Sequence, residues 1–383
     1  MLALTGELAF QIEAVETHCL RVPVSKHTAA SREDAMDGVP ALIVVLRFDD
    51  GAEGYGEVHC TLPRFSQFHK ARIIDEILSP LLVGRWFGSP EEMTAMLEAQ
   101  SHAIVVQSGE PGPFAHAIAG LDIAAWDGVS RRLDLPLWRL FTTEPRPATL
   151  PAYASGLDAA DLETLVPPLI EAGWRAFKLK VGGDAETDRR NIDRLRTLIG
   201  PEGRIMVDAN QAWDFATAER QITALAGCGL SWIEDPIAAD RSWDEWSVLT
   251  AIGPPIALGG NLRGPDAFHD AIDAGAAVVQ PDAMVWGGLS GARTIAETAS
   301  EAGVLWAPHA VAGGIGLAAT SHLTAALGGA YLEVDVHPHP LRDKALSDVI
   351  SIDDGMVKVS DAPGTGYLPS ASFLETYRAS ASA

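Results

Sequence analysis

The sequence predicts an α/β fold in which a TIM-type barrel of βα units follows an N-terminal α+β domain. Short apolar stretches recur every 22 to 28 residues, and six of the seven end in an ionisable residue. A strand, a loop and a helix need about that many residues, and eight such units close into a barrel in about 250 residues. The seven endpoints are Lys180, Asp208, Glu234, Gly260, Asp282, His309 and Glu333.

The α+β domain is expected over residues 1–145. Residues 12–24 alternate and predict a strand, and Ala41–Phe48 and Tyr55–Val58 flank the turn signal Asp49–Gly51. This pattern predicts an antiparallel hairpin or a three-stranded meander. Helical spacing follows over residues 66–80, 90–104 and 114–133.

The barrel is expected over residues 146–345. Prolines at positions 145, 147 and 151 mark the linker, Tyr153–Gly156 predicts the first barrel strand, and Asp161–Ala172 predicts its helix. The segment 346–383 shows no further βα unit, and we expect it to cross back onto the N-terminal domain.

Composition narrows the function classes. The net charge of −23 disfavours nucleic acid and anionic membranes as partners. Three cysteines without a CxxC pair indicate free thiols in a reducing compartment. Glu7 stands where a signal peptide needs an apolar core, and no uncharged apolar run approaches the roughly 20 residues of a membrane span. We therefore expect a cytoplasmic protein that binds neither nucleic acid nor membrane.

Asp208 and Glu234 end neighbouring strands, and they predict a metal site. Adjacent carboxylates at a barrel mouth repel each other unless a cation or a proton lies between them. Magnesium suits this place because it takes one or two protein carboxylates, keeps waters and accepts substrate oxygens. The alternative for each acid alone is a helix cap or an ion pair. Asn210 shares the face of Asp208 and is a candidate contact to substrate.

Lys178 and Lys180 alternate with apolar residues, so both point to one face, the barrel interior. A buried lysine beside a second cation loses proton affinity and can act as a base near neutral pH. The alternative is one structural ion pair and one solvent-exposed lysine.

Asp282 and His309 end the sixth and seventh strands. The aspartate can accept the Nδ1–H of the histidine and fix its tautomer. Lys180 and His309 would then address opposite faces of a substrate bound at the centre of the mouth. Glu333 ends the eighth strand, either as a hydrogen-bonding partner of a substrate oxygen or as a structural cap or ion pair.

These residues resemble the enolase superfamily and, within it, the mandelate racemase subgroup. The resemblance covers nearly the whole chain. It implies a modified (β/α)7β barrel and a capping domain that the C-terminal segment completes. The matching motifs are Lys178-Leu179-Lys180, Val207-Asp208-Ala209-Asn210, Glu234-Asp235-Pro236, Gln280-Pro281-Asp282 with Gly287-Gly288, Pro308-His309 and Leu332-Glu333.

The resemblance implies Mg²⁺ chemistry on a small-molecule carboxylate: a base removes the proton α to the carboxylate, and the metal holds the resulting enediolate. By analogy Lys180 and His309 act as base and acid, and Lys178 and Glu333 stabilise the enediolate oxygens. On the sixth strand, Asp282 stands where muconate-cycloisomerase-like relatives carry a catalytic lysine. Barrels of this subgroup usually associate, so we expect a homo-oligomer.

The fifth strand departs from the family pattern. The family has a third metal carboxylate in a Gly-Glu-Asn run, whereas this chain has Gly259-Gly260-Asn261. Either Asn261 becomes a neutral metal ligand, or water fills the gap, or the metal binds poorly and activity is weak or absent. Strand alternation points Asn261 away from the face of Gly260, so ligation by Asn261 needs a local twist.

The first functional hypothesis is an acid-sugar dehydratase that eliminates water from an aldonate or aldarate, with His309 as the acid. A racemase or epimerase and a lactone cycloisomerase use the same residues. A catalytically silent barrel that binds an acid metabolite is the alternative of another class. The loop 25–40 and the loop after Glu57 would cover the mouth and choose the substrate. Their candidate substrate contacts are Lys26, His27 and His59, together with Ser31 and Arg32.

Overall fold

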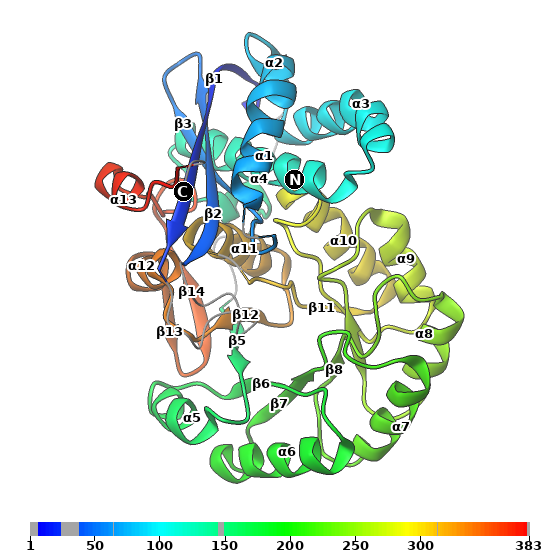
Figure 1. The fold of residues 1–383 in the computed structure, drawn as a ribbon. Helices are drawn as coiled ribbons and strands as arrows, with labels where there is room; N and C mark the ends of the chain where they lie inside the picture. The colour runs from blue at the N-terminus through cyan, green and yellow to red at the C-terminus, as the bar shows by residue number, and fades with distance from the viewer. Residues whose placement is uncertain (1–6, 24–37, 64, 145–148, 312, 381–383) are drawn as a thin grey trace.

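A computed structural model describes residues 7–23, 38–63, 65–144, 149–311 and 313–380 (Figure 1). Lys26 and His27, predicted to contact substrate, lie outside the described residues, as do Ser31 and Arg32. Among the helices of the described ranges, none is long and apolar enough to cross a membrane.

The N-terminal part is an antiparallel sheet covered by helices, which we call the cap. Its sheet order is β3-β2-β1-β4. The strands are β1 (Phe10–Val22), β2 (Val39–Phe48), β3 (Glu53–Val58) and β4 (Trp86–Phe87). The helices are α1 (Ser66–Ile73), a π-helical turn (Ile74–Leu78), α2 (Ser79–Leu82), α3 (Pro90–Ser108) and α4 (Pro111–Arg132). The predicted helix over 66–80 therefore contains a change of helical pitch.

Glycines let α4 pack directly on β3. A Cβ added at Gly54 would lie 2.0 Å from the carbonyl oxygen of Ala124, and one added at Gly56 would lie 1.9 Å from that of Gly120. No side chain fits in this contact, so the helix and the strand meet backbone to backbone. Beside it, Phe10 stacks on Phe48 with ring centroids 4.7 Å apart.

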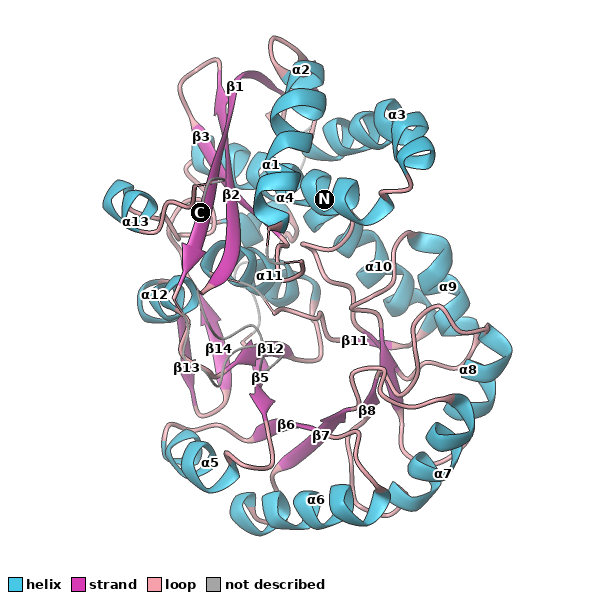
Figure 2. Ribbon diagram, viewed as in Figure 1, coloured by secondary structure: helices cyan, strands magenta, loops and turns pink. Residues whose placement is uncertain are grey.

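In the part of the chain that the structure describes, eight parallel strands form the barrel and seven helices lie outside it; Figure 2 shows the arrangement. The strands are β5 (Leu150–Leu157), β6 (Ala176–Lys180), β7 (Arg204–Asp208), β8 (Ile233–Glu234), β9 (Ile256–Leu258), β10 (Val278–Val279), β11 (Leu305–Trp306) and β12 (Leu332–Asp335). The helices are α5 (Leu162–Glu171), α6 (Ala185–Ile199), α7 (Phe215–Leu225), α8 (Trp243–Thr250), α9 (Pro265–Asp273), α10 (Gly288–Ala302) and α11 (Gly314–Leu327). β12 pairs with β5, and the Ala330 N–H donates to the Trp306 carbonyl beside β11. This is the (β/α)7β arrangement.

The barrel interior changes from apolar to polar along each strand. One buried cluster contains Tyr153, Ala176, Met206, Trp232, Ala257, Val278 and Ala307. Ala176, Met206 and Trp232 precede Lys178, Asp208 and Glu234 by two positions. Because side chains two apart share a strand face, the apolar layer closes the bottom of the barrel and the polar residues gather at the carboxyl ends.

The C-terminal segment packs on both parts of the molecule. It contains α12 (Pro340–Asp348), β13 (Ile350–Asp353), β14 (Met356–Val359) and α13 (Ala371–Thr376). β14 pairs antiparallel with the start of β5, and the Ala379 N–H donates to the Cys19 carbonyl of β1 at 2.8 Å. The crossing back onto the N-terminal part was predicted, whereas α12 and the β13–β14 hairpin were not.

The cap is joined to the barrel by a buried carboxylate. Glu57 of β3 accepts the backbone N–H of Gly313 at 2.7 Å and that of Gly316 at 2.9 Å. Both amides belong to the first turn of α11 or the residue before it, where the positive end of the helix dipole favours an anion. Each of these contacts orients the cap over the barrel mouth.

Candidate active site

Neighbouring strands align the polar ends. Lys180 is in register with Asp208, and Asp208 is in register with Glu234. Glu333 differs from its prediction, because it is the second residue of β12 rather than the last, and the strand continues to Asp335. Its side chain is therefore fully buried inside the barrel.

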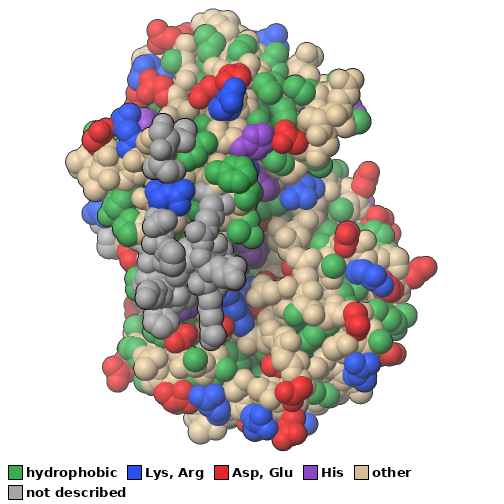
Figure 3. Space-filling view, in the orientation of Figure 1, with side chains coloured by type: hydrophobic (Ala, Val, Ile, Leu, Met, Phe, Trp, Pro, Cys, Tyr) green, Lys and Arg blue, Asp and Glu red, His purple; other side chains and the backbone are tan. Residues whose placement is uncertain are grey.

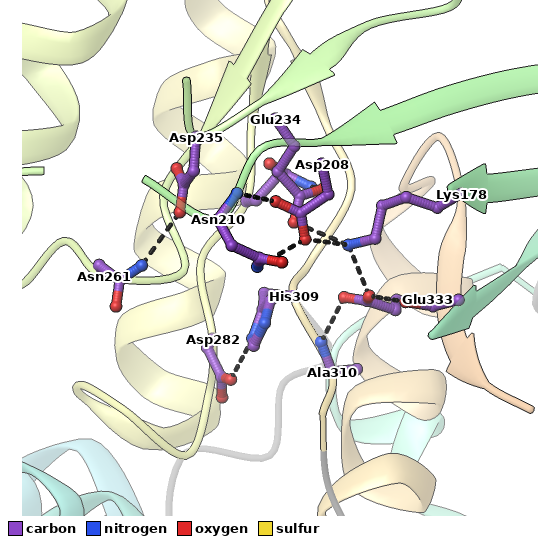
Figure 4. Close-up of polar contacts among 12 residues, drawn as sticks. Lys178, Asp208, Asn210, Glu234, Asp235, Asn261, Asp282, His309, Ala310 and Glu333 are labelled. Carbon is purple, nitrogen blue, oxygen red and sulfur yellow. Dashed lines mark hydrogen bonds and ion pairs between the residues drawn. The ribbon is translucent and has the colours of Figure 1, made fainter. Parts of the chain in front are cut away.

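Lys178 lies among three carboxylates (Figure 4). Its Nζ is 2.7 Å from Oε1 of Glu234, 2.7 Å from Oε1 of Glu333 and 3.8 Å from Oδ2 of Asp208. The Lys178 ammonium also lies 5.3 Å from the ring centroid of Tyr153, within cation–π distance. One cation therefore balances several buried acids.

The single ammonium of Lys178 does not neutralise all three carboxylates, and the pKa values differ among these groups. Burial, followed by the charge of Glu234, raises the pKa of Asp208 to about 7. Burial also favours the neutral form of Glu333, but Lys178 and His309 outweigh it and lower the pKa of Glu333 to about 2. Burial likewise opposes the charge of Lys178, but Glu234 and Glu333 hold its pKa well above the usual range. Burial and the neighbouring charge of Glu234 thus disfavour the ionised form of Asp208, and a cation bound beside Asp208 would offset this.

Asp282 holds His309. The His309 Nδ1 lies 2.7 Å from Oδ2 of Asp282, and the other Asp282 oxygen accepts the Met284 N–H at 2.7 Å. Burial alone would lower the pKa of His309, but Glu333 and Asp282 outweigh it and raise the pKa to about 10. The second oxygen of Glu333 accepts the Ala310 N–H at 3.1 Å, which ties the histidine loop to β12.

Gly260 lies under the ring of His309. A Cβ added at Gly260 would be 3.1 Å from Cγ of that imidazole. The position of the missing family glutamate therefore faces the site, and the imidazole fills the space in front of it. Asn261 is directed elsewhere: its Nδ2 donates to Oδ2 of Asp235 at 3.0 Å. Metal ligation by Asn261 stays a prediction.

The remaining predicted residues occupy three different places. Lys180 is exposed at the end of β6, and Lys178 makes the ion pairs with Glu234 and Glu333, so the predicted burial of Lys180 is wrong and the alternative of one ion-paired and one exposed lysine describes the structure. Asn210 donates both its backbone N–H and its Nδ2 to Asp208, at 2.8 and 2.9 Å. His59 lies on the cap, where it lines a cavity of about 100 Å³ with Met284. It therefore approaches the mouth from the cap side.

Two residues of the network were not predicted. Gln280 donates its Nε2 to Oε2 of Glu234 at 2.8 Å, and Ser155 donates its hydroxyl to Oε1 of Glu333 at 2.5 Å. A signal for both was present in the sequence, because each follows an apolar interior residue by two positions, Val278 and Tyr153 respectively. They orient the two glutamates that flank Lys178.

Two of the carboxylates fit a divalent cation of the magnesium type. Asp208 and Glu234 are buried and adjacent, and magnesium accepts two protein carboxylates when waters and substrate supply the other oxygens. Within the described ranges, no set of three or more His, Cys, Asp or Glu side chains is arranged to hold a metal. Gly260 supplies no carboxylate at the end of β9, where the resemblance implied a third metal ligand.

Sequence comparison matches both the N-terminal and the C-terminal part of the chain to known protein families. Residues 14–142 match the family described as mandelate racemase / muconate lactonizing enzyme, N-terminal domain, and residues 161–372 match the enolase C-terminal domain-like family. The chain belongs to the mandelate racemase/muconate lactonizing enzyme family. Its resemblance to the enolase superfamily and its predicted barrel with a cap are thereby confirmed.

Members of this family from several organisms are similar over nearly their whole length. A 3,6-anhydro-α-L-galactonate cycloisomerase from Streptomyces coelicolor is 31% identical, covering 93% of this chain and 96% of the relative. An arabinonate dehydratase from Saccharolobus solfataricus is 29% identical, covering 86% and 88%.

Solved structures of family members share the fold. A mandelate racemase/muconate lactonizing enzyme from Bordetella bronchiseptica superposes with a TM-score of 0.89 at 37% identity, covering 96% of this chain and 99% of the other. A racemase from Streptomyces coelicolor with bound magnesium superposes with a TM-score of 0.85 at 29% identity, covering 96% and 100%.

Proposed function

We propose that this protein is an acid-sugar dehydratase, a lyase that removes the proton α to a carboxylate and then eliminates water. The observation that carries the proposal is the Asp282–His309 pair, set at the same mouth as Lys180 and the Lys178 carboxylate network. The related arabinonate dehydratase acts in the same reaction class.

Lys180 is the proposed base. Its exposed amine at the end of β6 takes the proton from C2 of the substrate, and Lys178 stabilises the negative charge that develops on the carboxylate oxygens. His309 is the proposed acid. It donates its proton to the 3-hydroxyl, which leaves as water when the C3–O bond breaks, and the resulting enol becomes a 2-keto-3-deoxy acid.

Asp208 and Glu234 are the proposed ligands of Mg²⁺. When bound, the ion supplies positive charge that stabilises the developing oxyanion of the substrate carboxylate. Asn210 and Gln280 hold the two ligands from opposite sides, through bonds to Asp208 and Glu234 respectively. These hydrogen bonds fix the carboxylates before substrate arrives.

An isomerase is the second candidate, because a cycloisomerase is among the relatives. In a racemase or epimerase, His309 would return a proton to C2 instead of releasing water. In a cycloisomerase, the same pair would move the proton while a ring oxygen leaves or adds. The non-catalytic alternative is a barrel that binds an acid metabolite without turnover, because Gly260 supplies no third carboxylate.

Proton NMR in D₂O distinguishes these activities. The protein is incubated with Mg²⁺ and a panel of aldonates, aldarates and their lactones. A dehydratase gives a 2-keto product, an epimerase incorporates deuterium at C2 of recovered acid, and a cycloisomerase interconverts lactone and acid. Turnover that EDTA leaves unchanged would contradict the proposed role of Asp208 and Glu234 as metal ligands. Absence of both turnover and deuterium exchange for every acid of the panel would favour the non-catalytic binding protein.

We also infer that the protein works in the cytoplasm as a homo-oligomer. Its three cysteines are free thiols, which suits a reducing compartment. Sedimentation-equilibrium analysis measures the oligomeric state, and cell fractionation with a specific antibody measures the compartment. A monomeric mass at micromolar concentration would contradict the first inference, and recovery outside the cytoplasmic fraction would contradict the second.

A further inference from the structure

Four basic side chains meet where the cap covers the barrel, and we call them the basic cluster: His59, Lys70, His116 and Arg263. The first three belong to the cap, and Arg263 belongs to the loop between β9 and α9. Lys70 donates its Nζ to the His59 carbonyl at 2.5 Å, and the His59 and His116 rings meet edge to face at 5.0 Å. Arg263 reaches the start of α4, where a Cβ added at Gly112 would lie 3.5 Å from its Nη2.

Within the described residues, the positive charges of this cluster form no ion pair. Lys70 is only 2% exposed and has no carboxylate within ion-pair distance there, and Arg263, whose side chain is exposed, has none either. A buried ammonium without a counter-charge is costly, and natural proteins rarely leave one unpaired. Burial, and then the Arg263 charge, lower the pKa of Lys70 accordingly.

The imidazoles of the cluster also have unused hydrogen-bonding atoms. The Nδ1 of His59 and both ring nitrogens of His116 are buried without a partner among the described residues. Burial lowers the pKa of both rings, so each is neutral and can still donate one N–H. Buried polar atoms are normally satisfied, so these donors indicate a ligand that completes the site.

The cluster borders the reacting residues. Asp282 and His309 lie close enough to influence the charge state of His59, and Arg263 follows Gly260 by three positions. Figure 3 shows histidine side chains in the hollow between the cap and the barrel. Gly260, beside the His309 ring, supplies no carboxylate on this side of the mouth.

We propose that the basic cluster binds a second anionic group of the substrate, at the end of the molecule opposite the reacting carboxylate. The substrate class is then a dianionic acid sugar, whose far end is either a carboxylate, as in an aldarate, or a phosphate. Arg263 pairs with the anion in a fork geometry, and Lys70, His59 and His116 add donors from the cap. This inference rests on the proposed function, and it selects diacids over the monoacids that the reaction class also includes.

Isothermal titration in the presence of Mg²⁺ tests the proposal with matched ligands. Galactarate is compared with galactonate, and 6-phosphogluconate with gluconate, on the wild type and on three variants. Arg263→Gln and His116→Phe remove donors while circular dichroism checks the fold. Arg72→Gln is the control, because Arg72 lies on the same helix as Lys70 but is exposed and paired with Glu76.

We expect the wild type to bind one of the two ligands that carry a second anionic group, galactarate or 6-phosphogluconate, at least about tenfold more tightly than its monoanionic partner, the gain of one charge-assisted pair. Arg263→Gln should abolish that preference because it weakens dianion binding far more than monoanion binding, and Arg72→Gln should retain it. Preference for galactarate identifies the far group as a carboxylate, and preference for 6-phosphogluconate identifies it as a phosphate. Equal affinity for the paired ligands, or equal loss for both in Arg263→Gln, would overturn the proposal.

Deuterium exchange at C2 separates this proposal from the proposed function. Exchange or dehydration restricted to monoacids would sustain the dehydratase and refute the dianion site. Tight, Arg263-dependent binding of a dianion without exchange in any acid would sustain the site and refute the dehydratase.

Discussion

The ammonium of Lys178 on β6 lies 2.7 Å from a carboxylate oxygen of Glu333 on β12, and β5 lies between these two strands. The same ammonium is 2.7 Å from Glu234, which Gln280 also binds. Lys178 therefore joins strands that are distant in sequence, and it does so at a buried position inside the barrel. The Lys178 ammonium therefore stabilises the barrel and also provides positive charge at the candidate active site.

Replacing Lys178 with methionine should destabilise the protein by about 3–5 kcal/mol, because Glu234 and Glu333 lose the buried ammonium with which they pair. It should also abolish turnover, because the ammonium proposed to stabilise the charge on the substrate carboxylate is then absent. Urea denaturation measures the stability, and Lys358→Met, an exposed lysine on β14, is the control. Stability equal to that of the control would show that the carboxylates do not depend on Lys178.

Gly260→Glu should tighten Mg²⁺ binding about tenfold or more, because it restores a third carboxylate to a site that has two. Catalysis should fall at the same time, since the new side chain begins 3.1 Å from the His309 ring and must displace it. Gly260→Ala is the matched control, with the same steric demand at Cβ but no ligand. Calorimetry that shows equal Mg²⁺ affinity in all three proteins would mean that this position does not face the metal.

Asp282→Asn should shift the pH dependence of turnover. The protonated imidazole is the proposed acid, and it loses its proton as pH rises through its pKa, which is about 10 in the presence of Glu333 and Asp282. Without the Asp282 charge, the alkaline limb should move down by about one to three pH units. The measurement is kcat against pH; an unmoved limb in the variant would assign the limb to a group other than His309.

Glu57→Gln should lower the free energy of unfolding by about 1–3 kcal/mol, because an amide offers one acceptor where the carboxylate accepts two N–H groups. The free energy is read from urea denaturation. Glu13→Gln, at an exposed position of β1, is the control and should change stability little. If both variants unfold alike, the cap does not depend on this contact.

The barrel was predictable because its signal is periodic. Apolar runs that end in Lys180, Asp208 and Glu234 recur at βα spacing, and their register in the structure follows from that spacing. The end of β12 was misplaced, because Val334 after Glu333 extends the β-rich run and composition does not mark where pairing stops. The helix α12 and the β13–β14 hairpin were missed because their short segments carry no repeated period.

The partners of the polar residues were less predictable than the residues themselves. Asp282 and His309 were paired in advance because successive strands are neighbours. Glu333 and Lys178 come from strands six apart in order, and only closure of the barrel brings them together. The residues of the basic cluster come from two helices and two loops of the cap and the barrel, so no local sequence pattern predicts the cluster.

The two hydrogen bonds that Glu57 accepts at the start of α11 limit which caps can be combined with this barrel. A barrel excised from its cap would expose two amides that now have an ionic acceptor, and the excised protein would be prone to aggregate or unfold there. A chimaera that borrows a cap from a relative will assemble only if the donor carries an acid at the place of Glu57. Substrate specificity can therefore be exchanged by transplanting loops around this carboxylate more readily than by transplanting whole domains.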